Sequence, residues 1–367
     1  EDMQEIDEGW FANRSLFSCI GGGGTPRDKF TSGPTQPIGW IGVHNRFFTM
    51  TTMPTETLSG AQVYSIMTTP RLLNEQQTDG QYVHDTGILA SIRLPGKVLQ
   101  PGESIVQQFT TYAGPKEYRL LHSHAVTYKN PIDSAMGLDG FIGFFSKLLL
   151  RSMNGLHSLG LGYALCIITI TIIIKILFWP LTKRSTISMK RVAAYQPQLK
   201  EINEKYKDDP QKKQKRTMEF MREHKINPMG GCWPILIQMP IFIGFFYLLR
   251  SAVELRGAQF LWACDLSQPD TIAHIAGFPI NPLPLIMGVT MLLQAQLTPV
   301  SPTMDPTQQK IMKFLPLMII VFLYNFSSGL ALYWTINNML SILQTKLTKN
   351  IVVEAPDVTK TKSALAK

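Results

Sequence analysis

One charged side chain, Lys175, lies in an otherwise uncharged apolar run from Leu159 to Leu181. About 20 apolar residues in a helix are enough to cross the hydrocarbon of a bilayer, so this run predicts a membrane span. A cation at the centre of such a span costs about 2.5–3.5 kcal/mol on insertion scales. The chain must therefore shelter the ammonium group, let it reach the membrane surface, or use it.

Four further hydrophobic segments follow, and together with the first they predict five spans. We expect them at 159–181, 233–249, 279–297, 311–326 and 329–347. Basic residues mark the cytoplasmic side of a membrane protein. The segment 182–229 holds 13 Lys and Arg against 6 Asp and Glu, whereas 251–280 holds Arg256 against three acidic residues. These charges place 182–229 inside and 251–280 outside, and five spans then place the region before them outside as well.

The residues before the spans differ in composition. Residues 1–136 carry 10 Lys and Arg against 13 Asp and Glu, whereas 137–367 carry 25 against 13. Strand-like runs separated by Gly, Pro, Asn and Asp predict an antiparallel β domain. These runs are 38–53, 61–69, 87–94 and 104–114. We expect His122 and His124 to share one face of a strand. The opening residues resemble the middle of a domain, so an upstream targeting segment is expected.

Two amphipathic segments flank the first span. Residues 137–158 place Phe141 and Phe144 at helical spacing, which is typical of a helix in the membrane interface but also of an ordinary core helix. The basic segment 182–229 predicts two charged helices broken at 208–210, since Pro suits the first turn of a helix. Such a hairpin holds the topology by its charge, and a basic helix could also bind RNA.

Polar side chains recur inside the spans. Thr171 lies one helical turn before Lys175, Gln238 lies in the second span and Asn337 in the fifth. Single amides in membranes often only join helices, at about 0.6–2 kcal/mol each. None of the five spans contains Asp or Glu. Lys175 therefore either extends its stem to the inner membrane surface or lies in a wet cavity open to the cytoplasm.

Several long blocks of the second half resemble the bacterial YidC-type membrane protein insertases. They are ITITIIIKILFWPLTKRSTISMKR, NPMGGCWPILIQMPIFIGFFYLLRSAVELR, LPLIMGVTMLLQAQLTP, DPTQQKIMKFLPLMIIVFL and SSGLALYWTINNMLSILQ. The runs GWIGVHNRFFTM and PGESIVQQFTTYAGPKEY are similar to the end of that family's periplasmic β domain. The resemblance covers about 137–350, and it implies that the family's signal-anchor span and much of its β domain lie outside this sequence.

The resemblance also implies a fold. It is a multi-domain membrane protein with part of an antiparallel β-sandwich of the supersandwich type, followed by a five-helix transmembrane core with a cytoplasmic helical hairpin. The implied parts are the periplasmic domain at 1–136, the interfacial helix at 137–158, the insertase core at 159–350 and a basic cytoplasmic tail at 351–367.

The function implied is that of a membrane protein insertase and chaperone. It would insert and help fold nascent inner-membrane proteins through a hydrophilic groove open to the cytoplasm, alone or with the Sec translocon. Implied partners are nascent membrane proteins, the Sec translocon, membrane lipids and, through the basic hairpin and tail, the ribosome, but not DNA. The resemblance implies a multi-pass protein of the bacterial inner membrane and no enzyme, with no cofactor, metal or covalent chemistry.

Site residues can be carried over by position. Lys175 takes the position of the groove cation, where most of the family has Arg; Lys keeps the charge but lacks the fork of donors that grips a carboxylate. The positions expected to line the groove or contact substrate are Thr171, Gln238, Met239, Phe242, Tyr333, Trp334 and Asn337. Trp334 is a departure, because the family often has Tyr there.

Two other classes would also place polar groups in a membrane. A polytopic small-solute transporter or channel is the alternative, and it should show repeated halves or helix pairs broken by Gly and Pro. A membrane enzyme should show HExxH, GxSxG or paired intramembrane carboxylates. The sequence contains no internal repeat and none of these motifs.

Overall fold

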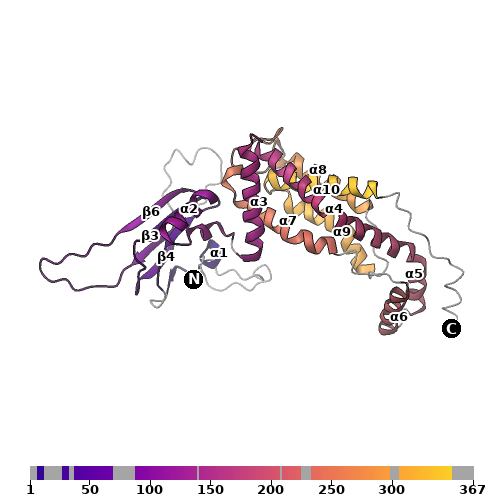
Figure 1. Ribbon diagram of the computed structural model, residues 1–367, viewed down its shortest axis with the longest axis horizontal. Helices are drawn as coiled ribbons and strands as arrows, with labels where there is room; N and C mark the ends of the chain where they lie inside the picture. The colour runs from indigo at the N-terminus through magenta and orange to yellow at the C-terminus, as the bar shows by residue number, and fades with distance from the viewer. Residues whose placement is uncertain are drawn as a thin grey trace. The chain divides into compact units, whose positions relative to one another are not determined.

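The computed structural model divides into two compact units, Glu1–Leu138 and Asp139–Lys367 (Figure 1). The residues that it describes are 6–11, 27–32, 37–68, 87–138, 140–206, 209–224, 233–297 and 306–348. The predicted basic tail 351–367 lies outside the described residues. A β-rich unit followed by a helical unit confirms the coarse architecture that the sequence predicts.

The first unit contains two small antiparallel sheets, and the short helix α1 (Glu8–Phe11) precedes them in the chain. One sheet has the order β1 (Lys29–Thr31), β4 (Gln62–Thr68), β5 (Gly87–Arg93), and the other β2 (Ile41–His44), β3 (Phe48–Pro54), β6 (Phe109–Pro115). A tight turn joins β2 to β3, where the side chain of Asn45 accepts from the backbone N–H groups of Phe47 and Phe48 at 2.9 and 2.8 Å. β2 to β6 lie within one residue of the runs that the sequence predicts, whereas β1 lies outside them.

The prediction of a strand at His122 and His124 is wrong. Both lie in the helix α2 (Tyr118–Tyr128), which ends where Lys129 adopts a left-handed conformation with φ 50°. Two alternating histidines are a weak period-2 signal, whereas the buried side chains of Tyr118 and Leu121 recur at helical spacing. On the helix the histidines point in different directions. His122 Nδ1 pairs with a carboxylate oxygen of Asp133 at 3.0 Å.

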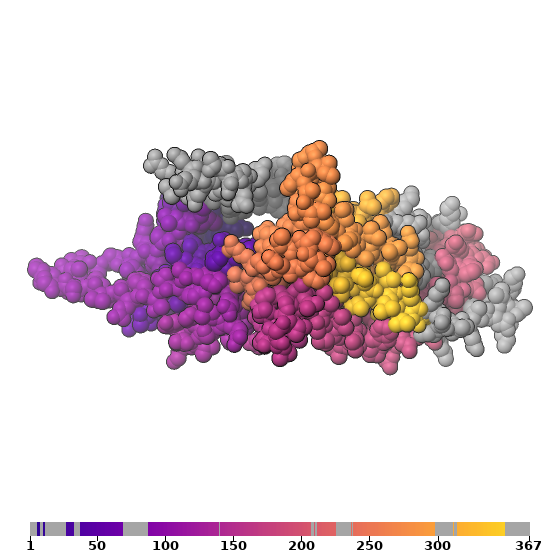
Figure 2. Space-filling model, turned by 90° about the horizontal axis from the view of Figure 1, so that it is seen from above, coloured from indigo at the N-terminus to yellow at the C-terminus, as the bar shows by residue number. Residues whose placement is uncertain are grey.

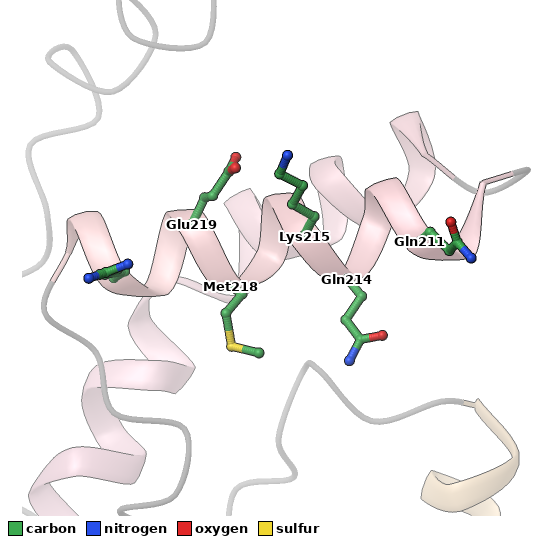
Figure 3. A pocket seen from close by; sticks show the side chains of 6 residues that line it. Gln211, Gln214, Lys215, Met218 and Glu219 are labelled. Carbon is green, nitrogen blue, oxygen red and sulfur yellow. The ribbon is translucent and has the colours of Figure 1, made fainter.

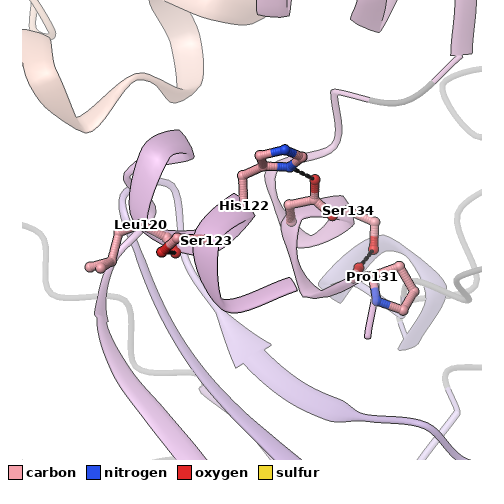
Figure 4. A network of polar contacts seen from close by, with 6 residues as sticks. Leu120, His122, Ser123, Pro131 and Ser134 are labelled. Carbon is pink, nitrogen blue, oxygen red and sulfur yellow. Dashed lines mark hydrogen bonds and ion pairs between the residues drawn. The ribbon is translucent and has the colours of Figure 1, made fainter. Parts of the chain in front are cut away.

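That carboxylate belongs to the single-turn 3-10 helix η3 (Ile132–Met136), which follows α2. Figure 4 shows His122 over this turn, and the Ser134 hydroxyl donating to the carbonyl of Pro131 at 2.6 Å. In α2 the Ser123 hydroxyl donates to the carbonyl of Leu120 at 2.7 Å. The bond between His122 and Asp133 therefore joins α2 to η3, and the fully buried side chain of Ile132 anchors η3 in the apolar interior.

The second unit consists mainly of helices. They are α3 (Gly140–Ser158), α4 (Tyr163–Ala194), α5 (Gln196–Lys205), α6 (Pro210–Glu223), α7 (Trp233–Ser251), α8 (Pro282–Leu297), α9 (Pro306–Leu323) and α10 (Ser328–Leu347). Between α7 and α8 lie the turn η5 (Val253–Leu255) and the strands β7 (Ala273–Ile275) and β8 (Phe278–Ile280). α10 packs against α4, α7 and α8, which makes it the central helix of the unit.

Small residues allow close helix packing in this unit. The hydroxyl of Ser146, on α3, donates to the carbonyl of Gly244, on α7, at 3.0 Å. A Cβ at Gly244 would lie 3.1 Å from the Cβ of Phe145. Helices in membranes associate through such small residues, because lipid removes the hydrophobic drive for packing. The fit between α3 and α7 therefore depends on glycine at position 244.

α4 is longer than the sequence predicts. The expected span ends at Leu181, but the helix continues past Pro180 to Ala194. Polar residues do not by themselves end a helix, and neither Gly nor Pro occurs between Leu181 and Gln196. The hairpin is therefore α5 and α6, with a core of Leu199, Ile202 and Phe220. As predicted, α6 begins at Pro210, and the Asp209 side chain accepts from Lys212 N–H as its N-cap.

Exposed apolar side chains cover several helices of the second unit. Ile176 on α4 is 65% exposed, Val289 on α8 is 57% exposed and Val321 on α9 is 75% exposed. By length and composition, α4 is the one helix among the described residues that could cross a membrane, and Pro282–Leu297 and Phe314–Leu323 are shorter apolar helices. Apolar faces of this extent need an apolar surrounding.

Candidate functional site: a polar cluster among three helices

The ammonium group of Lys175 lies against the central helix, α10. Its Nζ, on α4, donates to the hydroxyl of Ser341, on α10, at 2.8 Å. Ser341 in turn donates to the backbone carbonyl of Asn337, one turn earlier, at 2.8 Å. The cation is thus bound to a neutral hydroxyl, and both side chains are half-buried.

A second interhelical bond extends the cluster to α7. Gln238 Nε2 donates to Asn337 Oδ1 at 2.8 Å. Lys175, Ser341, Asn337 and Gln238 therefore form one polar cluster, contributed by α4, α10 and α7. Sequence reasoning named three of the four and missed Ser341. A signal was present, because Ser341 lies four residues after Asn337 and shares its helix face.

Further polar bonds follow the seam between α4 and the end of α10. Buried Gln344 donates from its side-chain amide to the hydroxyl of Thr182. Lys190 Nζ donates to the backbone carbonyl of Thr348, just past the last residue of α10. A cation suits that end, because the carbonyls there carry the negative pole of the helix dipole. The extension of α4 beyond the apolar run is thus fixed to α10.

Aromatic side chains lie on the preceding turn of α10. Tyr333 is buried and stacks on Phe245 of α7, with ring centroids 4.2 Å apart. Trp334 meets Phe242 edge to face at 4.7 Å. Such contacts add about 0.5–1.5 kcal/mol to the burial of the rings. Three of the expected site residues, Phe242, Tyr333 and Trp334, thus come together in a packed contact between α7 and α10.

Two predicted site residues lie apart from the cluster. Thr171 is 2% exposed, and its hydroxyl donates to the carbonyl of Ile167 on its own helix at 2.7 Å. It therefore packs inside the unit although it shares a helix face with Lys175. Met239 is 44% exposed, since the residue after Gln238 points about 100° away from it around α7.

A pocket of about 420 Å³ lies along α6 (Figure 3). Its lining is Gln211, Gln214, Lys215, Met218, Glu219 and Arg222. The labelled side chains stand along one helix, as their spacing requires. None of them belongs to the polar cluster, so the hairpin carries a separate surface of mixed charge.

Comparison with known proteins places the second unit in a family. The model of the family described as "60Kd inner membrane protein" matches residues 155–355. A "Membrane protein insertase YidC" of Syntrophus aciditrophicus (strain SB) is 40% identical over 258 residues, which is 70% of this chain and 45% of that protein. The protein of the same name from Nitratidesulfovibrio vulgaris (strain DP4) is 33% identical over 344 residues, 91% of this chain and 58% of that protein.

The solved structures include a match described as "Active YidC insertase crystal structure with the first transmembrane domain resolved". The match has a TM-score of 0.44 and 19% identity, and it covers 90% of this chain and 82% of that chain. The chain spans about half the length of the curated relatives it matches. Because the family model covers more than half of the residues, the chain belongs to the 60Kd inner membrane protein family of YidC-type insertases.

Proposed function

We propose that the chain inserts and helps fold nascent membrane proteins in a bacterial inner membrane. Family membership supports this, since the relatives carry the name of membrane protein insertases. The observation that carries the proposal is the bond between Lys175 and Ser341, because it leaves a positive charge on a neutral partner between apolar helices.

Because Ser341 is neutral, a carboxylate of a substrate can replace it as the hydrogen-bond partner of Lys175. A carboxylate offers the ammonium group a full opposite charge in addition to the hydrogen bond, whereas the Ser341 hydroxyl offers only a dipole. At an effective dielectric constant of 20, two opposite unit charges 4 Å apart attract by about 4 kcal/mol. Lys175 should therefore bind an acidic segment of a substrate more strongly than it binds the Ser341 hydroxyl. Lys acts here as a point charge, without the planar fork that an Arg would offer.

The same proposal assigns a topology. α4, α7, α8, α9 and α10 would cross the membrane, with the α5–α6 hairpin on the cytoplasmic side and the loop between α7 and α8 outside. α3 would lie in the interface: Phe141 and Phe144 are 70% and 63% exposed, whereas Leu150 is buried on the opposite face. The exposed apolar faces of α4, α8 and α9 support lipid contact along the bundle.

The groove would lower the barrier for a polar external segment. Gln238, Asn337 and Ser341 supply hydrogen-bonding groups between the helices, so the segment would cross less hydrocarbon. Burial of the substrate's apolar span would drive insertion, and the membrane potential adds about 2.3 kcal/mol per charge per 100 mV. Nascent chains, the Sec translocon and the ribosome are the partners proposed; five basic residues on α6 support contact with the ribosome.

Insertion in cells that lack their own insertase tests the proposal. Wild type, Lys175→Ala and Lys175→Arg are each supplied as the full-length protein, and two small substrates that differ only in an acidic or neutral external tail are followed by protease protection. We expect Lys175→Ala to lose insertion of the acidic-tailed substrate and Lys175→Arg to keep it. Equal insertion of both substrates by the Ala variant would overturn the role of the cation.

A further inference from the structure

A short β-hairpin lies between α7 and α8. Its strands β7 and β8 pair antiparallel, with Ile275 opposite Phe278 and Ala273 opposite Ile280. The turn residues Ala276 and Gly277 have φ values of 50° and 80°. Two consecutive positive φ angles form the tight turn whose twist matches that of the strands it joins. The hairpin therefore has a defined register and two defined faces.

The two faces differ in chemistry. Residues directly opposite each other on an antiparallel pair share a face, so Ile275, Phe278, Ala273 and Ile280 lie on one side. All four are apolar, and Ile275 and Phe278 are 65% and 57% exposed. His274 lies on the other side. The hairpin contains no Asp, Glu, Lys or Arg.

Hydrogen bonds fix the base of the hairpin to the end of α9. The hydroxyl of Tyr324 donates to the carbonyl of Pro279 at 2.7 Å. Asn281 is fully buried, and its side-chain amide donates to the carbonyl of Tyr324 at 2.9 Å. The Thr271 hydroxyl donates to Asn281 Oδ1 at 2.6 Å. These bonds fix the orientation of the hairpin relative to the end of α9, and the ring of Phe278 lies beside that of Tyr324.

Exposed apolar side chains also lie near the start of α8. This helix begins at Pro282, directly after Asn281, and its first turns expose Leu285 (47%) and Val289 (57%). In Figure 2 the orange part of the chain between α7 and α8 projects from the side of the helical unit.

We propose that the apolar face of the β7–β8 hairpin lies in the membrane interface and contacts lipid acyl chains at the end of the bundle where α8 begins. Lipid is the occupant that fits, because the face is uncharged, the next helix along the chain exposes apolar side chains of its own, and the chain belongs to an inner membrane protein family. The bonds to Tyr324 and Asn281 then set the depth of the start of α8 and the end of α9 together.

Fluorescence quenching in vesicles tests this placement. The full chain, with Cys19, Cys166, Cys232 and Cys264 replaced by Ala, is reconstituted alone in phosphatidylcholine vesicles. Single cysteines from Ile275→Cys and Phe278→Cys carry an environment-sensitive dye, and His274→Cys on the opposite face is the matched control. Phosphatidylcholine spin-labelled on its acyl chain quenches from the lipid side, and iodide on both sides of the vesicle quenches from water.

We expect the lipid quencher to reduce the emission at positions 275 and 278 more than at 274, and iodide to show the reverse order. Equal quenching by iodide at all three positions would overturn the proposal. Dyes at 275 and 278 that are shielded from both quenchers would also overturn it, since a second copy of the chain would then cover the face. Circular dichroism of each variant confirms that it is folded, and the readout does not depend on insertion activity.

Discussion

The bond between Lys175 and Ser341 should contribute little to stability if water reaches the polar cluster. A double-mutant cycle with Lys175→Met, Ser341→Ala and the double variant isolates this contribution. In dry surroundings a hydrogen bond to a charged group contributes about 1.5–3 kcal/mol. Interhelical hydrogen bonds in membrane proteins average about 0.6 kcal/mol. Both side chains are half-buried, so we expect a coupling of about 0.5–1 kcal/mol.

The assay is reversible unfolding of the purified full chain by dodecyl sulfate in dodecyl maltoside micelles, followed by circular dichroism. Thr345→Ala provides the matched control, since the Thr345 hydroxyl donates to the carbonyl of Ser341 on its own helix at 2.9 Å. The cycle of Lys175→Met with Thr345→Ala should show no coupling. A coupling of about 3 kcal/mol between Lys175 and Ser341 would refute the reasoning, because it would mark a sealed structural pair.

Three further changes test other parts of the second unit. Gly244→Ala places a Cβ 3.1 Å from that of Phe145; overpacking costs about 1–3 kcal/mol, and an unchanged thermal midpoint in micelles would contradict close packing of α3 on α7. Asp270 is buried and its carboxylate accepts from an indole N–H and from a backbone N–H of α8 at 2.8 and 2.7 Å. Asp270→Ala should therefore cost about 1–3 kcal/mol per orphaned donor, seen in the same midpoint. The backbone N–H of Lys212 lowers the pKa of Asp209 below its ordinary 3.8, so the cap stabilises α6 above that pH and is lost as pH falls through the lower folded-state value. The protection of the α6 amides, measured against their intrinsic exchange rate at each pH, should fall in that acid range in wild type and change little in Asp209→Asn, and equal protection profiles would contradict the cap.

Periodicity and charge predicted the parts of the fold that depend on local sequence. The strand runs, the break before Pro210 and the apolar helices all follow from such patterns. The end of α4 could not be predicted in this way, because the polar residues after Leu181 change the surroundings of the helix without breaking its backbone hydrogen bonds. His122 and His124 failed for a related reason: two residues cannot define a period against helical spacing of the buried side chains around them.

The candidate site shows where sequence reasoning stops. An uncharged run made Lys175 conspicuous, and its helix face could be worked out from spacing. Its partner Ser341 lies on another helix, 166 residues away, and one sequence does not fix the rotation of one helix against another. For the same reason the sequence did not predict that Thr171, which shares a helix face with Lys175, is buried between helices.

Access of water to the polar cluster is the central claim. In a background without the native cysteines, Asn337→Cys places a thiol within the cluster and Thr171→Cys places one in the packed interior. Both are treated in intact inverted membrane vesicles with a membrane-impermeant maleimide, which reaches the cytoplasmic face. We predict rapid labelling at 337 and slow labelling at 171. Protection of position 337 equal to that of 171 would contradict a groove open to the cytoplasm.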